Sequence, residues 1–156
     1  MGSAKGVHLT LAALGFFALL APKNAMAAGP YSYFPLTPCR FVDTRDSSLQ
    51  GGAPLSSFVV KTFTAKGKCG IPSTAKAISV NVTIAVPGGP GFLTLYPSGV
   101  VKPYVSVINW ASTDNAIANG AVVPLGSAST NDLSAYEEEG GTGTVHLILD
   151  VTGYFQ

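Results

Sequence analysis

His146 is the residue best suited to act as a catalytic base in this chain of 156 residues. A serine hydrolase needs a histidine beside its nucleophile, and many such enzymes carry the serine in a Gly-x-Ser-x-Gly turn. That motif does not occur, and the other histidine, His8, lies in the N-terminal segment 1–27. We therefore interpret His146 as a structural histidine, and we expect the protein not to be an enzyme.

Pairs of carboxylates could hydrolyse glycosides if two were held at the right separation. The candidates are Asp43, Asp46, Asp114, Asp132 and Asp150. Aspartate in a turn commonly accepts a hydrogen bond from its own backbone, which favours structural roles. Because Arg40 and Arg45 lie close to Asp43 in the sequence, we predict an ion pair among them that fixes the first strand. Removing one partner would destabilise the fold rather than abolish a reaction.

The acidic run Glu137-Glu138-Glu139, with Asn131 and Asp132 nearby, could supply oxygen ligands for calcium. Its spacing does not resemble an EF-hand loop. The alternative interpretation is a solvated turn whose charges prevent pairing between sheet edges. Zinc is disfavoured, because only one histidine follows the N-terminal segment. We therefore predict no metal site and no cofactor, with calcium as the alternative that this run leaves open.

Several tyrosines lie beside turns or polar neighbours, where an exposed ring could stack on the face of a sugar. These candidate ligand-binding residues are Tyr31, Tyr33, Tyr96, Tyr104 and Tyr136. Aromatic side chains also fill the cores of β-sandwiches, so each of them has a structural alternative. Trp110 is a core candidate by its place in a predicted strand.

The two cysteines, Cys39 and Cys69, suggest a disulfide. An even number of cysteines in an exported chain is typical of such a bond, because the compartment is oxidising. A reactive thiol would need a histidine partner. Closing a loop of about thirty residues is worth roughly 3.5 kcal/mol in the chain-entropy account.

Residues 1–27 are typical of a cleaved signal peptide. Lys5 precedes an apolar run from Leu9 to Ala21, and Ala25-Met26-Ala27 has the small residues that signal peptidase accepts. The run is shorter than the roughly 20 residues that span a bilayer, although an uncleaved anchor is the alternative. Loss of Lys5 and Lys23 leaves 7 basic residues of 9 against 8 acidic ones. Nucleic acid is then an unfavourable partner, because phosphate binding needs a basic surface.

Alternation of apolar and polar residues predicts an all-β fold for the rest of the chain. The clearest case is Ala77 to Val86, where every second residue is Val or Ile, as in a strand with one buried face. The fold class that these strands favour is an antiparallel β-sandwich, Ig-like or jelly-roll-like, with a barrel as second choice. We predict an extended arm at 28–38 and one sandwich domain at 39–156. Further strands are expected at Arg40–Thr44, Ser57–Thr64, Phe92–Tyr96, Tyr104–Trp110, Ala116–Pro124 and Thr144–Phe155.

An ordered set of short motifs covers nearly all of this region. It includes Pro38-Cys39-Arg40 with Asp43-Thr44-Arg45, Gly70-Ile71-Pro72 with Ala75-Lys76-Ala77, Asn81-Val82-Thr83, Tyr96-Pro97-Ser98-Gly99, Ser106 to Asn109, Ala118-Asn119 with Val122 to Leu125, and Asp150-Val151-Thr152-Gly153-Tyr154-Phe155. The set resembles a β-sandwich accessory module of bacterial secreted and cell-surface proteins. The resemblance implies an extracellular module with no catalytic residues. Since the predicted leader runs almost directly into the motifs, we expect the module to act without an attached enzyme domain.

Two functions remain open on this evidence. The first is a secreted, non-catalytic module that binds polysaccharide or peptidoglycan at the cell surface or in the extracellular matrix, with the periplasm as an alternative location. The second is a self-assembling structural subunit, in which the arm at 28–38 adds a strand to the sheet of a neighbouring copy. The expected partner is thus a cell-wall or extracellular polymer, or copies of the same chain, with no membrane span after processing.

Overall fold

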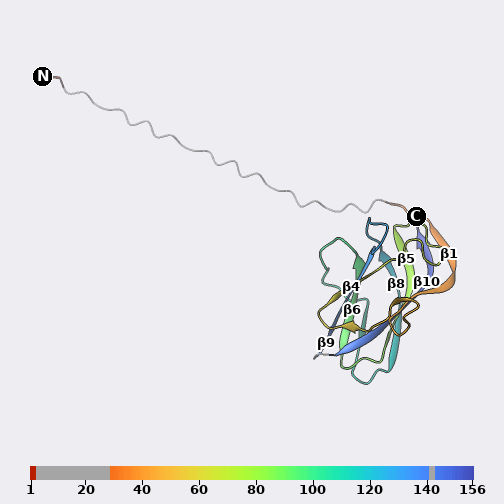
Figure 1. Ribbon diagram of the computed structural model, residues 1–156. Coiled ribbons are helices and arrows are strands. Elements are labelled where there is room, and N and C mark those ends of the chain that lie inside the picture. Colours follow the sequence, from red (N-terminus) through yellow and green to blue (C-terminus); the bar gives the residue numbers. More distant parts are fainter. Residues whose placement is uncertain (3–28, 141–142) are drawn as a thin grey trace.

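The computed structural model describes residues 1–2, 29–140 and 143–156 (Figure 1). Nearly all of the predicted signal peptide therefore lies outside the described residues. Within them, no helix is long and apolar enough to cross a membrane. The fold is all-β, with two sheets and no closed barrel, so the prediction of a β-sandwich is confirmed.

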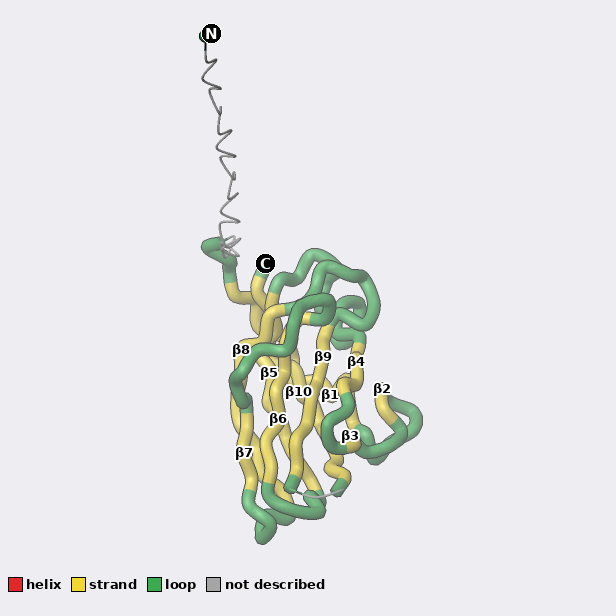
Figure 2. The backbone as a smooth tube through the Cα atoms, turned by 90° about the vertical axis from the view of Figure 1, so that its left-hand side faces the viewer, coloured by secondary structure: helices red, strands yellow, loops and turns green. Residues whose placement is uncertain are grey.

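The larger sheet has six strands and the smaller has four (Figure 2). In the larger sheet the order is β2 (Gln50–Gly51), β1 (Tyr33–Asp43), β10 (Thr144–Phe155), β5 (Ala77–Ala85) and β8 (Ala116–Pro124), and β3 (Leu55–Ser56) also pairs with β10. In the smaller sheet the order is β4 (Val60–Phe63), β9 (Leu133–Glu139), β6 (Gly91–Pro97) and β7 (Ile108–Trp110). All pairs are antiparallel except β1 with β2.

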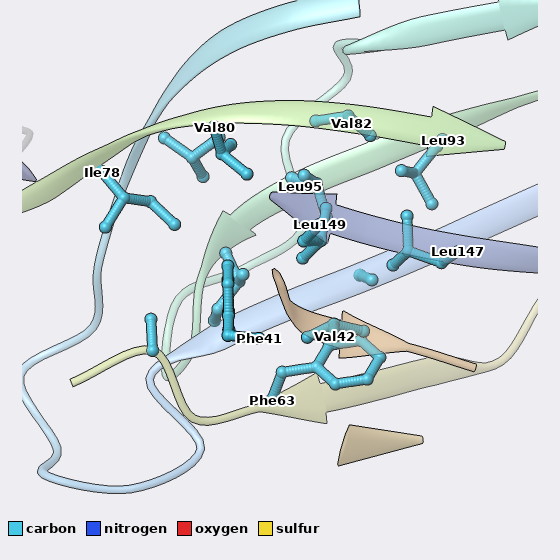
Figure 3. Close-up of a cluster of buried hydrophobic side chains, with 14 of the residues drawn as sticks. Phe41, Val42, Phe63, Ile78, Val80, Val82, Leu93, Leu95, Leu147 and Leu149 are labelled. Carbon is cyan, nitrogen blue, oxygen red and sulfur yellow. The ribbon is translucent and has the colours of Figure 1, made fainter. Parts of the chain in front are cut away.

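The core lies between the two sheets and follows from the alternation in the sequence (Figure 3). On β5, every second side chain from Ile78 to Ile84 is buried, and the side chains between them are only partly covered. On β10, Val145, Leu147 and Leu149 are also fully buried. Each such side chain contributes roughly 1.5–3 kcal/mol through burial, which holds the sheets face to face.

The predicted arm is not separate from the domain, because β1 runs from Tyr33 through the expected boundary at Cys39. Its first residues pair with the end of β10, and Tyr33 and Phe34 pack against aromatic rings of that strand at centroid distances of 5.2 and 5.1 Å. Pro35 and Pro38 are tolerated because this part of β1 is a sheet edge. From Tyr33 onward, the arm is therefore a strand of its own domain.

The disulfide between Cys39 and Cys69 is present, as predicted. It joins β1 to the turn that follows β4, over a sequence separation of 30 residues. The bond thus ties an edge of the larger sheet to a loop of the smaller one.

Two predicted strands are shorter in the structure. The segment Ser57–Thr64 forms only β4, and Phe58 interrupts it with a φ of 65°. The segment Tyr104–Trp110 forms only β7, because the residues before Ile108 belong to a loop that crosses β6. That loop is important for the candidate site.

Candidate ligand-binding groove

Two of the five candidate tyrosines, Tyr104 and Tyr136, line one groove on the outer face of the smaller sheet. Its volume is about 580 Å³, within the usual range for small-ligand sites. The structure places Tyr31 and Tyr33 elsewhere, where the chain enters β1 beside the end of β10. It also buries Tyr96, of which 5% is exposed, so Tyr96 was a wrong candidate for ligand binding.

The floor of the groove comes from neighbouring positions on three strands. Phe92 on β6 pairs with Asn109 on β7 and with Glu138 on β9, so these three side chains form a row across the sheet. Tyr136 lies two residues before Glu138 and therefore points to the same outer face. The residue on β6 that pairs with Tyr136 is Thr94. Strand register alone thus brings an aromatic ring, an amide and a carboxylate together beside a second ring.

The wall of the groove is the loop 98–107, which is fastened over β6. Thr94 Oγ1 donates a 2.6 Å hydrogen bond to the carbonyl of Val105, and the Val107 amide donates to the Leu93 carbonyl at 2.8 Å. The side-chain amide of Asn119, on β8, donates a 2.7 Å hydrogen bond to the Val107 carbonyl. This arrangement places Tyr104 at the rim of the groove, where its ring is fully exposed.

Charged groups in the groove gather around Tyr136. Lys102 Nζ lies 4.2 Å from the centroid of the Tyr136 ring and 5.2 Å from that of Tyr104. The Tyr136 hydroxyl donates a 3.1 Å hydrogen bond to Glu138 Oε2. Burial and the nearby Glu138 carboxylate raise the pKa of Tyr136, so the ring remains a neutral phenol. Lys102 and Glu138 balance each other in charge, and both can bind polar groups of a ligand.

Sequence reasoning missed Phe92, Lys102, Asn109 and Glu138 as groove residues. For Phe92 a signal was present, because it shares strand phase with Thr94 and Tyr96 and so faces away from the core. The other three become neighbours only through pairing between strands and through the path of the loop 98–107.

The outer face of the larger sheet contains the predicted ion pairs. Arg45 donates two hydrogen bonds to the Asp43 carboxylate, at 2.9 and 2.7 Å, and Arg40 contacts the same carboxylate at 3.2 Å. Arg40 also binds both oxygens of Asp150, at 2.7 and 3.0 Å, a contact that the sequence did not indicate. The hydrogen bonds from Arg45 hold the pKa of Asp43 at about 2. The cluster joins β1 to β10 and serves the fold.

His146 lies on this same larger sheet, and the groove lies on the smaller one. Its Nδ1 is 3.0 Å from Thr44 Oγ1, which also accepts a hydrogen bond from the Leu147 amide. Asp46 and Asp114 accept hydrogen bonds from the backbone of their own turns, at Ser48 and Ala111. These contacts are those of structural residues.

The acidic run does not form the predicted turn. Glu137 to Glu139 belong to β9, an inner strand between β4 and β6, so the prediction of a solvated turn was wrong. Glu137 and Glu139 point inward and are buried, with 0% and 1% exposed, while Glu138 points into the groove. The run is a strand because backbone pairing on both sides outweighs the cost of burying the Glu137 and Glu139 side chains.

The structure also separates the proposed calcium ligands. Asp132 precedes the far end of β9 and accepts hydrogen bonds from the amides of Ala65 and Lys66, at 2.7 and 3.0 Å. The Asn131 side chain is exposed beside it. Across residues 29–140 and 143–156, no three or more His, Cys, Asp or Glu side chains are arranged to hold a metal ion.

Comparison with protein-family models, with curated proteins and with solved structures finds no match for this chain. The resemblance to a secreted accessory module therefore remains a prediction from its motifs.

Proposed function

We propose that this chain is a non-catalytic, extracellular carbohydrate-binding module whose groove on the smaller sheet binds a polysaccharide. The observation that carries the proposal is the convergence of three aromatic rings, from Phe92, Tyr104 and Tyr136, with polar side chains in one open groove. A sugar ring has apolar C–H faces and a rim of hydroxyl groups. The aromatic rings can stack on the C–H faces of the sugar, and Asn109, Lys102 and Glu138 can form hydrogen bonds with its hydroxyl groups.

The balance of charge in the groove favours a neutral polysaccharide. Lys102 and Glu138 have opposite charges, and both contact Tyr136. The groove therefore offers no net electrostatic attraction to an acidic or a basic polymer. Full exposure of Tyr104 leaves the groove open along the sheet, which suits a chain that extends beyond the site. A disulfide fits an oxidising compartment and so supports an extracellular setting.

The alternative of a subunit that donates its N-terminal arm to a neighbour has less support. Tyr33 to Pro35 already pair with β10 of the same chain, and donation would require those contacts to break.

Retention on insoluble polysaccharides tests the proposal. The protein, Tyr104→Ala and Tyr31→Ala would be incubated with cellulose, chitin, xylan and peptidoglycan, and the unbound fraction measured. We expect retention on at least one polymer, an about tenfold weaker association for Tyr104→Ala, as is usual for an aromatic anchor, and no change for Tyr31→Ala. Tyr31 is the matched control, because it is an exposed tyrosine outside the groove.

Two outcomes would contradict the proposal. One is the absence of retention on every polymer. The other is equal weakening by the Tyr104 and Tyr31 substitutions, which would show that binding does not depend on the groove.

A further inference from the structure

The edges of the two sheets are protected to very different degrees. The β1 edge carries Pro35 and Pro38, two register shifts and the disulfide. On the smaller sheet, the edge strands β4 and β7 have four and three residues. In contrast, β8 has nine residues, none charged, and pairs with β5 without a register shift. Long, regular and uncharged edges of this kind are sites of strand addition.

The direction of the β8 backbone groups follows from two hydrogen bonds at its ends. The Leu125 amide donates to the Lys76 carbonyl, and the Val86 amide donates to the Asn115 carbonyl, both at 2.8 Å. In an antiparallel pair, alternate residues bond to the same neighbour, so the odd-numbered residues of β8 bond to β5. The even-numbered residues therefore point their N–H and C=O groups to the open edge. None of these groups bonds to another strand within the described residues.

We propose that β8 pairs antiparallel with β8 of a second copy, about a two-fold axis at Gly120, to give a symmetric dimer with a continuous sheet. Gly120 is the middle residue of the strand, so this register uses all of β8 on both copies. Ala118 then lies opposite Val122 of the second copy, and Ala116 opposite its Pro124. Even-numbered residues meet only even-numbered ones, so the free donors and acceptors face each other. Pro124, which lacks an N–H, falls at the end of the ladder.

Side chains on β8 suit this self-pairing. Those of the even-numbered residues are all exposed, small or absent, and uncharged, so no like charges meet across the axis. Gly120 has free space around it, since a Cβ there would meet nothing within 4 Å. The arm of another copy fits less well, because Pro30, Pro35 and Pro38 remove the amides that a continuous ladder needs. An isologous partner is therefore the one that the edge matches.

Sedimentation velocity over a range of protein concentrations tests this dimer and its register. Wild type should be a reversible monomer–dimer system, because one strand pair buries less surface than a standard interface. The double variant A118K/V122K sets lysine opposite lysine at two places and should raise the dissociation constant at least tenfold. A118K/V122E sets lysine opposite glutamate and should restore it to within about threefold of wild type. V59K is the matched control, because Val59 is an exposed loop valine that does not line the groove.

Circular dichroism would establish that each variant is folded. If A118K/V122K does not fold, G120K replaces it, because the space at Gly120 accepts a side chain and two lysines would meet at the axis. The proposal is overturned if wild type stays monomeric up to millimolar concentration, if the lysine variants associate as wild type does, if A118K/V122E does not recover, or if species larger than dimers form. Polysaccharide retention should be the same for all variants, so failure of the dimer and failure of the groove are distinguishable.

Discussion

The outer faces of the two sheets use their polar side chains in opposite ways. On the larger sheet these side chains bind one another: Arg40 binds Asp150, and the hydroxyl groups of Ser79 and Thr152 are 3.0 Å apart. On the smaller sheet, the loop 98–107 raises Tyr104 and Lys102 above the strands and leaves Asn109 exposed. A face whose polar side chains bond to one another stabilises the fold, while a face with exposed rings and amides can bind a ligand.

The largest effect of pH on stability is expected at Glu137, on the inner face of β9. Burial, with Glu139 as a second cause, raises the pKa of Glu137 from 4.5 to about 7. A raised pKa means that stability is fully present below the ordinary value and is lost as pH rises through 7. The loss approaches about 3 kcal/mol once the carboxyl ionises. Glu137→Gln cannot ionise and should unfold at higher urea concentration than wild type at about pH 8.

Glu138→Gln is the matched control for this prediction, because Glu138 is the next residue and points outward. Its stability should vary with pH as that of wild type does. If the free energy of unfolding of wild type and of Glu137→Gln depended on pH in the same way, Glu137 would not be the responsible group. The predicted loss of stability at alkaline pH would then not arise from the smaller sheet.

A smaller effect on stability is expected at Asp43, on the larger sheet, where stability is lost as the pH falls and not as it rises. Hydrogen bonds from Arg45 lower the pKa of Asp43 from 3.8 to about 2, so its contribution is present above pH 3.8 and is lost as pH falls through 2. Asp43→Asn should destabilise the protein by about 1–2 kcal/mol at neutral pH, since both arginines are partly exposed to solvent. Urea unfolding of wild type and variant between neutral and acidic pH measures the difference.

Polysaccharide retention by Asp43→Asn should equal that of wild type under conditions where both are folded. A folded Asp43→Asn protein that no longer binds the polymer would contradict the division of roles between the two faces.

Strands with regular alternation could be predicted closely from the sequence. The segments Ala116–Pro124 and Thr144–Phe155 have the expected bounds, and Ala77–Val86 is one residue longer than β5. The reason is physical: one buried face imposes a period of two on the residues. The disulfide was also predictable, because only one pairing of two cysteines exists.

Strand β9 could not be predicted, because Glu137 and Glu139 occupy inward positions where the pattern calls for apolar residues. Of the eight residues that line the groove, only two were predicted as ligand-binding residues. Tyr104 and Tyr136 were candidates by type, but their meeting depends on how β6 pairs with β9 and on a loop tied to Thr94. Neither of these is a local property of the sequence, and Tyr96 was a wrong candidate because its side chain is buried.

We propose that the groove face, and not the outer face of the larger sheet, binds the polysaccharide. A nuclear magnetic resonance titration of isotope-labelled protein with soluble oligosaccharides of the retained polymer tests it most directly. We expect the resonances of Phe92, Tyr104 and Asn109 to shift. Those of Thr83 and Thr152, on the larger sheet, should not change. Shifts centred on Thr83 and Thr152, or none in the groove at saturating oligosaccharide, would contradict it.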